Sequence, residues 1–160
     1  MTYAIDTILY ATDRGPRSLE VLNHAVGMAR RFGARLHLVT VIDTPMPADR
    51  NLFHTYLSDD QIAQMQVDAR TRVGEYLQRG LAAHDAAHPD QPHGEVLASV
   101  QILEGNAVEL LLEQATELKA DLIVLGSHGH NPLGEMLIGS VAHKVMTRSR
   151  VPVLLVPINQ

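Results

Sequence analysis

Short apolar runs and longer amphipathic segments alternate along the chain from near its start to its end. The short runs are rich in Val, Ile and Leu, and their near-continuous apolar character predicts strands that are buried on both faces, as in a parallel sheet. The longer segments place apolar residues three and four positions apart, which predicts helices with one core-facing side. The predicted strands are residues 7–12, 36–42, 96–103, 121–126 and 151–157.

Polar residues mark where the first two predicted helices begin and end. Ser18 stands before an amphipathic run and Gly33 follows it, so we expect Ser18 to be the N-cap and Gly33 to end the helix. Ser58 and Gln61 form a capping box, in which each side chain satisfies a backbone amide of the first turn. The helix that follows them is predicted to run to about Ala83.

The remaining segments predict two more helices, a loop and a linker. Asn106 with Glu109 predicts the start of the third helix, and a fourth helix is predicted to begin near Gly134. Residues 43–57 contain two prolines and are predicted to form a long loop. The polar segment 84–94 is predicted to be a surface linker.

Five strands separated by four helices predict an α/β fold with a doubly wound parallel sheet, as a single domain over residues 1–160, because parallel strands need long crossovers. Pro152 cannot donate to a strand ladder, so the last strand is predicted to lie at a sheet edge. This edge, residues 151–157, is apolar and carries no lysine, and such an edge invites pairing with another chain. We therefore expect a homodimer formed through it.

Composition excludes several classes of protein. The chain has 160 residues, which suits one domain, and no Cys, which excludes disulfides and thiolate metal sites. Thirteen Lys and Arg against eighteen Asp and Glu give a net charge of −5. The chain therefore lacks the excess of positive charge that binds nucleic acids or membrane surfaces. The N-terminal residues lack the pattern of a secretory signal. We expect a cytoplasmic protein.

A glycine-rich segment, residues 126–140, follows the predicted fourth strand directly and leads into a helix. Ligands of open α/β sheets lie outside the carboxyl ends of the strands, which is where this segment begins. Gly126 and Gly129 allow a close approach of backbone amides, and Gly139 with Ser140 adds a second small patch with a hydroxyl group. Phosphate oxygens are natural partners of such amides. Spacing alone is equally typical of a tight turn without a ligand.

The four residues Gly126, Gly129, Gly139 and Ser140 have the spacing G-x2-G-x9-G-[ST], which resembles the ATP-binding signature of the universal stress protein family. The resemblance continues through most of the chain, and the chain is identified as a member of the ATP-binding subgroup. It implies a Rossmann-like fold of the adenine nucleotide alpha hydrolase type with strand order 3-2-1-4-5. The other segments that resemble the family are 8–13, 120–129, 139–142 and 151–156.

The resemblance also implies roles for individual residues. The glycines and Ser140 would hold the triphosphate, with Val141 adding a backbone amide. Asp13 would face the nucleoside, and Val41 would line the adenine. The full set implied to bind the nucleotide is Ala11, Thr12, Asp13, Val41, Gly126, Ser127, His128, Gly129, His130, Gly139, Ser140 and Val141.

The chain departs from the family pattern in the glycine-rich segment and in the residues around Asp13. His130 stands where a basic residue is common, so phosphate affinity is expected to be weaker or dependent on pH. Ala11 replaces the usual proline, and Arg14 replaces a small residue. Arg14 either reaches a phosphate or is solvated, and we favour solvation. The remaining histidines offer too few ligands for a metal site and are expected to be solvated: His84, His88 and His93.

The sequence supports one leading function and two alternatives. The leading prediction is a dimeric, ATP-dependent regulator of a stress response that binds ATP with Mg²⁺ and an unknown protein partner. The first alternative is a slow ATP hydrolase or autophosphorylating protein, with Asp13 holding Mg²⁺ and Ser140 accepting a phosphoryl group. No Walker-type lysine lies within residues 126–140, so efficient catalysis is not expected. The second alternative, an interaction module without a ligand, disagrees with the complete glycine signature.

Overall fold

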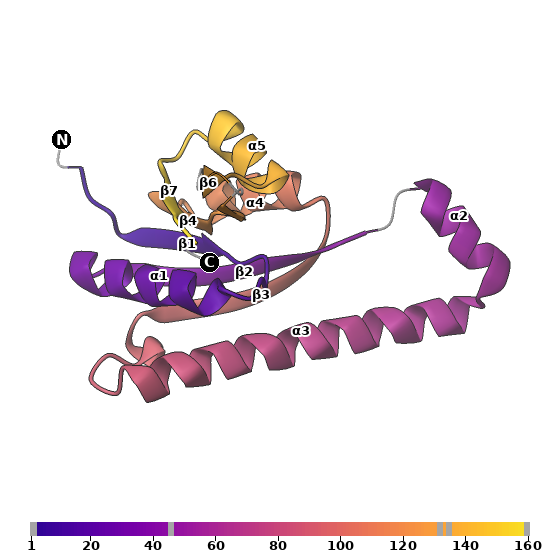
Figure 1. Ribbon diagram of the computed structural model, residues 1–160, viewed down its shortest axis with the longest axis horizontal. Coiled ribbons are helices and arrows are strands. Elements are labelled where there is room, and N and C mark those ends of the chain that lie inside the picture. The colour runs from indigo at the N-terminus through magenta and orange to yellow at the C-terminus, as the bar shows by residue number, and fades with distance from the viewer. Residues whose placement is uncertain (1–2, 45–46, 131–132, 134–135, 159–160) are drawn as a thin grey trace.

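A computed structural model describes residues 3–44, 47–130, 133 and 136–158. Five strands form one parallel sheet in the order β3-β2-β1-β4-β7 (Figure 1). This confirms the predicted five-stranded sheet and its order, because β7 is the fifth of the predicted strands. The strands are β1 (Thr7–Ala11), β2 (Arg35–Asp43), β3 (Leu97–Gly105), β4 (Leu122–Gly126) and β7 (Val153–Val156).

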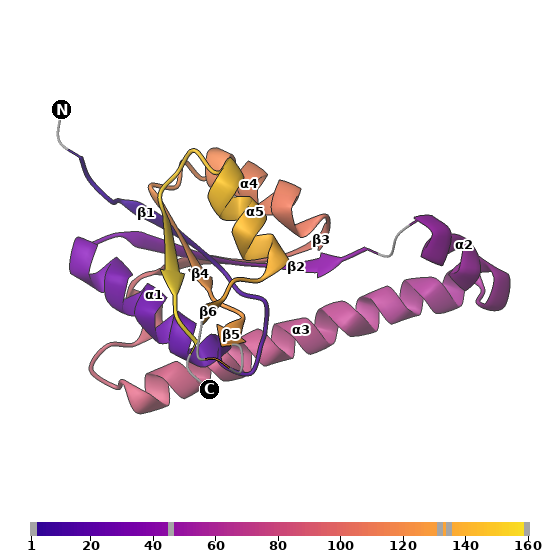
Figure 2. The ribbon, with the colours of Figure 1, turned by 45° about the horizontal axis from the view of Figure 1, so that its top comes forward.

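Helices cover both faces of the sheet (Figures 1 and 2). On one face lie α1 (Ser18–Phe32) and α3 (Asp59–Ala87), and on the other lie α4 (Ala107–Glu117) and α5 (Ser140–Arg148). Successive residues of a strand point to opposite faces, so β1 contributes to two separate cores. Ile8 and Tyr10 pack under α1 and α3, whereas Leu9 and Ala11 pack under α4 and α5. This double burial explains the continuous apolar runs of the sequence.

The described part of the chain contains five α-helices, so the prediction of four was wrong. The additional helix, α2 (Pro47–Tyr56), occupies most of the segment that was predicted to be a loop because of its prolines. A proline at the first helical position loses no hydrogen bond and has a suitable φ, so Pro47 starts this helix. No helix in the described ranges combines the length and the apolar character that crossing a bilayer requires.

Three predicted helix boundaries rest on polar contacts that the structure contains. The Oγ of Ser58 accepts a hydrogen bond from the Gln61 amide at 3.2 Å, and the Gln61 Oε1 accepts one from the Ser58 amide at 2.9 Å. The Asn106 side chain accepts from the Glu109 amide at 3.0 Å. Gly33 ends α1 with a φ of 64°, which glycine adopts without strain. The capping box, the asparagine cap and the glycine stop are thus confirmed.

Two predicted helix starts were wrong. Arg17 is the N-cap of α1, and Ser18 belongs to the first turn, where its hydroxyl lies 2.6 Å from the Tyr76 hydroxyl of α3. The fourth predicted helix was expected to begin near Gly134, which lies outside the described residues, but α5 begins at Ser140. A short antiparallel pair, β5 (Gly129–His130) with β6 (Met136–Leu137), precedes it. The Ser18 hydroxyl thus contacts α3 instead of capping α1. The β5–β6 pair occupies residues before α5, so that helix begins later than predicted.

His84 is buried, so its predicted place in a solvated linker was wrong. Helix α3 continues past it and ends only where Pro89 approaches, because the residue before a proline avoids the helical region. The His84 side chain is 2% exposed, with its Nδ1 2.6 Å from the Asn23 Oδ1 and its Nε2 3.1 Å from the Gln91 carbonyl. Both ring nitrogens therefore join α3 to its neighbours. Within the described residues no three side chains form a possible metal site.

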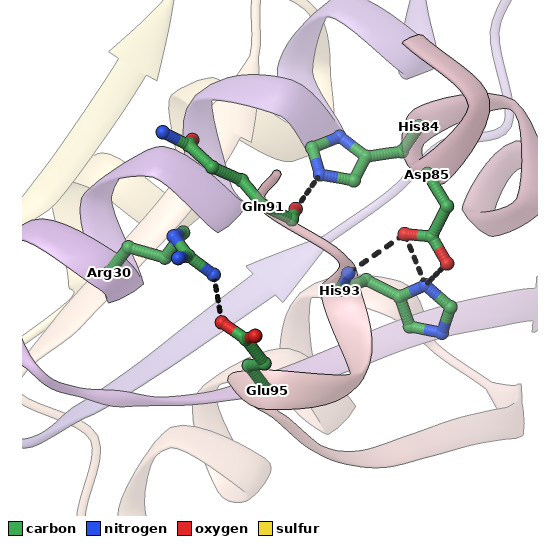
Figure 3. A network of polar contacts seen from close by, with 6 residues as sticks. All are labelled: Arg30, His84, Asp85, Gln91, His93 and Glu95. Carbon is green, nitrogen blue, oxygen red and sulfur yellow. Dashed lines mark hydrogen bonds and ion pairs between the residues drawn. The ribbon is translucent and has the colours of Figure 1, made fainter. Parts of the chain in front are cut away.

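The end of α3 is tied to a short 3-10 turn, η1 (His93–Glu95), by the Asp85 carboxylate (Figure 3). Asp85 Oδ1 accepts from the His93 amide at 2.8 Å and lies 2.9 Å from the His93 Nδ1. These hydrogen bonds lower the pKa of Asp85 from its ordinary 3.8. Arg30 of α1 pairs with Glu95 of the same turn (Figure 3).

We expect Asp85→Asn to lower the free energy of unfolding at neutral pH, since the carboxylate is favoured in the folded state. A carboxyl with a depressed pKa contributes stability above its unfolded pKa and loses it as pH falls through the folded pKa. The difference from wild type should therefore shrink below pH 3.8. Urea unfolding at neutral and acidic pH measures it, with the exposed Asp90→Asn as control. A difference that persists unchanged in acid would contradict this assignment.

Candidate functional site

A pocket of about 540 Å³ lies at the carboxyl ends of the central strands. Its walls are the ends of β1 and β2, the turn after β4 and the first turn of α5. Strands β1 and β4 are hydrogen-bonded neighbours in the sheet, although more than a hundred residues separate them. Chain order reverses between them, so the loops after the two strands diverge and leave a crevice. The fold thus brings the two ends of the predicted site together.

Ten of the twelve residues that the sequence assigned to nucleotide binding line this one pocket. The other two, Gly129 and His130, form β5, directly after the turn that follows β4. The ten lining residues are Ala11, Thr12, Asp13, Val41, Gly126, Ser127, His128, Gly139, Ser140 and Val141.

Packing against α1 leaves no room for a side chain at Gly126. A Cβ at this position would lie 2.8 Å from the Val21 Cγ2 and 3.1 Å from the Ile158 Cδ1. Both distances are shorter than van der Waals contact, and Val21 belongs to α1. The glycine therefore allows α1 to approach the end of β4, and Gly126 and Val21 both line the pocket. Neither a tight turn nor the approach of a ligand, the two reasons that the sequence offered for this glycine, includes this contact with α1.

Gly139 has more space around it. It is the N-cap of α5, with φ −62° and ψ 157°, values that any residue can adopt. A Cβ there would lie 3.6 Å from the Cβ and Nδ1 of His128, which is ordinary contact. Because glycine has no side chain that could cap the helix, the wall of the pocket here consists of the first turn of α5. The amides of such a turn, with the helix dipole, bind anions.

Ser127 also has a structural task at the pocket wall. Its side chain is 1% exposed, and its Oγ accepts a hydrogen bond from the Ile158 amide at 2.7 Å. The turn after β4 is thereby fixed to the segment that follows β7. This hydrogen bond and the one that the Ser127 amide donates to the Val156 carbonyl hold the turn, and with it His128, at the wall of the pocket.

Asp13 lies exposed at the mouth of the pocket, directly after β1. Its Oδ1 accepts a hydrogen bond from the Gly15 amide at 2.8 Å, which closes a local turn. Asp13 does not cap the first helix, because Arg17 is the N-cap of α1. A carboxylate has further lone pairs, so Asp13 can still accept from a ligand hydroxyl or amine.

Arg14 is half-buried in the pocket wall, so the prediction that it is solvated was wrong. Its Nη1 donates to the Thr40 Oγ1 at 2.7 Å and to the Val41 carbonyl at 3.3 Å. The Thr40 hydroxyl in turn donates to the Thr12 carbonyl at 2.9 Å. Within the described residues no carboxylate forms an ion pair with Arg14. The positive charge of Arg14 therefore lies beside Val41. The backbone φ of Arg14, 60°, directs its side chain there.

The pocket lining also contains polar residues that the sequence did not assign to nucleotide binding, among them Tyr10 and Asp43. Tyr10 lies under the pocket floor and donates from its hydroxyl to the Ser18 carbonyl at 3.0 Å. Burial raises the pKa of Tyr10 far above its ordinary range, so it stays a neutral donor. Asp43 ends β2 at the same edge as Val41. Asp43 directly follows the predicted strand 36–42 just as Asp13 follows 7–12, but the role of Asp13 came from the family resemblance, which gave no role to Asp43.

Comparisons with known proteins give matches over nearly the whole chain. The model of the universal stress protein family matches residues 4–157. The stress response protein NhaX of Bacillus subtilis is 28% identical over 165 residues, covering 94% of this chain and 97% of the relative. A universal stress protein structure from Burkholderia pseudomallei is 27% identical with a TM-score of 0.64, covering 96% and 97%. Another, solved in complex with cAMP, is 25% identical with a TM-score of 0.60 and the same coverage.

Proposed function

The chain belongs to the universal stress protein family, and on that premise we propose that it binds ATP in the pocket at the ends of β1 and β4. In this proposal the bound nucleotide controls the protein's action as a cytoplasmic regulator of a stress response. The observation that carries it is the convergence of Asp13, Val41 and Gly139 on one pocket from three separate parts of the chain.

The lining offers complementary partners for the parts of an adenine nucleotide. The first turn of α5 provides amides for phosphates, and the Asp13 carboxylate accepts from a ribose hydroxyl or an exocyclic amine. Val41 provides an apolar surface for the base. A volume of about 540 Å³ is within the range of small-molecule sites. The cAMP complex of a relative supports an adenine nucleotide as the class of ligand.

The pocket lining contains carboxylates that could help to hold a Mg²⁺ ion bound to the phosphates of the nucleotide. The ion is held mostly by phosphate oxygens and water, with one or two carboxylates. Asp13 and Asp43 are the carboxylates that line the pocket. The glycine-rich segment contains no lysine that could stabilise a transferring phosphoryl group, which favours binding over turnover.

We also propose the β7 edge as a contact between two copies. The structure places β7 at the end of the strand order, next to β4 alone. An apolar edge strand without Lys or Arg offers its outer backbone groups to a second copy of the same strand.

Protein purified without added nucleotide is expected to carry ATP, which denaturation and chromatography of the supernatant detect. Near-stoichiometric ATP supports the binder and argues against efficient hydrolysis. Bound ADP or AMP would favour the hydrolase instead. Empty protein requires calorimetric titration with Mg-ATP, and a titration without heat at saturating ligand would reject the proposal.

A further inference from the structure

The loop between β1 and α1, residues 12–17, is tied to α3 through the hydroxyl group of Tyr76. Helix α3 runs beside α1 on one face of the sheet (Figures 1 and 2). The Tyr76 hydroxyl donates to the Gly15 carbonyl at 3.0 Å and lies 2.6 Å from the Ser18 hydroxyl at the start of α1. Within the described residues, no other side chain of α3 is hydrogen-bonded to this loop. Tyr76 and Gly15 are 61 positions apart in the chain, so only the fold brings them together.

Tyr76 lies where α3 first reaches the core of the protein. None of the side chains of α3 from residue 59 to residue 76 is fully buried, and Leu77 is the first that is. The half-buried Tyr76 ring packs on the core cluster that contains Tyr10 and Val21, two residues of the pocket lining. A tyrosine in such a place keeps its hydroxyl hydrogen-bonded. The packed ring therefore holds a hydrogen-bonding group at a defined place beside the loop.

Gly15 connects Tyr76 to Asp13 through its two backbone polar groups. Its carbonyl accepts from the Tyr76 hydroxyl at 3.0 Å, and its amide donates to the Asp13 Oδ1 at 2.8 Å. A Cβ on Gly15 would lie 3.0 Å from the same Oδ1, which is closer than ordinary contact. The Asp13 carboxylate therefore lies directly against the Gly15 backbone. Where Gly15 is held determines where this carboxylate lies.

The loop is held on two sides, and the residue between the two anchors has an unfavourable conformation. The Arg14 side chain donates to the Thr40 Oγ1 of β2 at 2.7 Å, and the next residue, Gly15, is held by Tyr76 of α3. Arg14 itself has a φ of 60°, in the left-handed region that costs energy for any residue with a Cβ. The native shape of the loop therefore depends on its anchors, and Tyr76 supplies one of them.

We propose that Tyr76 is a positioning residue of the nucleotide site. Its hydroxyl holds Gly15, and through Gly15 the Asp13 carboxylate, in the orientation that a bound nucleotide requires. This inference rests on the proposed function, in which Asp13 accepts hydrogen bonds from the nucleoside. Tyr76 does not belong to the pocket lining, so it acts without touching the ligand. Without the hydroxyl the loop leaves its binding conformation for part of the time, and the apparent affinity falls by that fraction.

The docking of α3 itself does not depend on this hydroxyl. Leu77 and Leu81 anchor the helix in the core, and the His84 Nδ1 lies 2.6 Å from the Asn23 Oδ1 of α1. These contacts remain when only the hydroxyl of Tyr76 is removed. Loss of the hydroxyl should therefore change the position of the loop and leave the fold of α3 intact.

Calorimetry of the full chain with Mg-ATP tests this role. Tyr76→Phe should lower the affinity about three- to tenfold, the effect of one hydrogen bond, while circular dichroism shows the wild-type fold. Tyr56→Phe is the matched control, because it removes the same group from a side chain of α2 that is 78% exposed. Equal affinities of wild type and Tyr76→Phe overturn the positioning role alone. A wild type that binds no ATP rejects the proposed function as well.

A double-mutant cycle with Asp13→Ala separates positioning from a general structural effect. If the hydroxyl acts through the Asp13 carboxylate, Tyr76→Phe should cause no further loss of ATP affinity once that carboxylate is absent. A general loosening of α3 against the sheet would lower the affinity equally in both backgrounds. Equal losses with and without Asp13 therefore overturn the proposal.

Discussion

Gly139→Val is expected to abolish ATP binding while the protein remains folded. Gly139 has an ordinary extended conformation, and a Cβ would lie 3.6 Å from its nearest neighbours in His128. The fold therefore accepts a side chain at this position. The added methyl groups would occupy the space beside the first turn of α5, where we place the phosphates. A loss of two phosphate contacts of about 1.5–3 kcal/mol each lowers affinity by a hundredfold or more.

Isothermal calorimetry with Mg-ATP measures this loss, and urea unfolding shows whether stability is kept. Gly94→Val is the matched control, because a Cβ at Gly94 meets no atom within 4 Å and lies far from the pocket lining. Gly139→Val with wild-type affinity would place the phosphates elsewhere. Lost affinity together with a large loss of stability would show instead that Gly139 is needed for the fold.

Gly126→Ala should have the opposite profile, with a large effect on stability. Its Cβ would lie 2.8 Å from the Val21 Cγ2, between β4 and α1. Overpacking of a tightly packed position costs about 1–3 kcal/mol in the free energy of unfolding. Because the clash is with a specific methyl group, Val21→Ala should relieve much of it in the double variant.

A double-mutant cycle by urea unfolding measures this relief. Val21 and Gly126 are in contact, so the effects of the two changes should not be additive, and the double variant should be more stable than the sum of the single losses indicates. Additive losses would show that the helix moves to accept the alanine. Gly27→Ala in the same helix is a suitable control, since a Cβ there meets nothing within 4 Å.

The two glycines show the limit of a motif. Both belong to the spacing that resembles the ATP-binding signature, and the spacing alone treats them alike. In the structure both line the pocket, but a Cβ at Gly126 would clash with Val21 of α1, whereas a Cβ at Gly139 would make ordinary contacts with His128. Only the position of α1 against β4 shows that packing requires a glycine at Gly126 and leaves room for a side chain at Gly139.

Local chemistry determined most of the fold from the sequence. Runs such as 36–42 and 121–126 are apolar on both faces, so only a sheet covered by helices on both sides accommodates them. Caps such as Ser58 with Gln61 act within one helical turn and need no tertiary partner. The strand ends placed Asp13 and Gly126 at the same edge, because parallel strands end on one side.

Tertiary structure decided the features that depend on distant contacts. His84 was predicted to lie in a solvated linker, but it is buried in a contact with Asn23 of another helix. Arg14 was predicted to be solvated, but it donates hydrogen bonds to Thr40 and the Val41 carbonyl in the pocket wall. Residues 43–57 were predicted to be a loop, whereas α2 (Pro47–Tyr56) occupies most of them in the structure. The sequence encodes local preferences directly, whereas burial and pairing depend on which distant segments the sheet brings together.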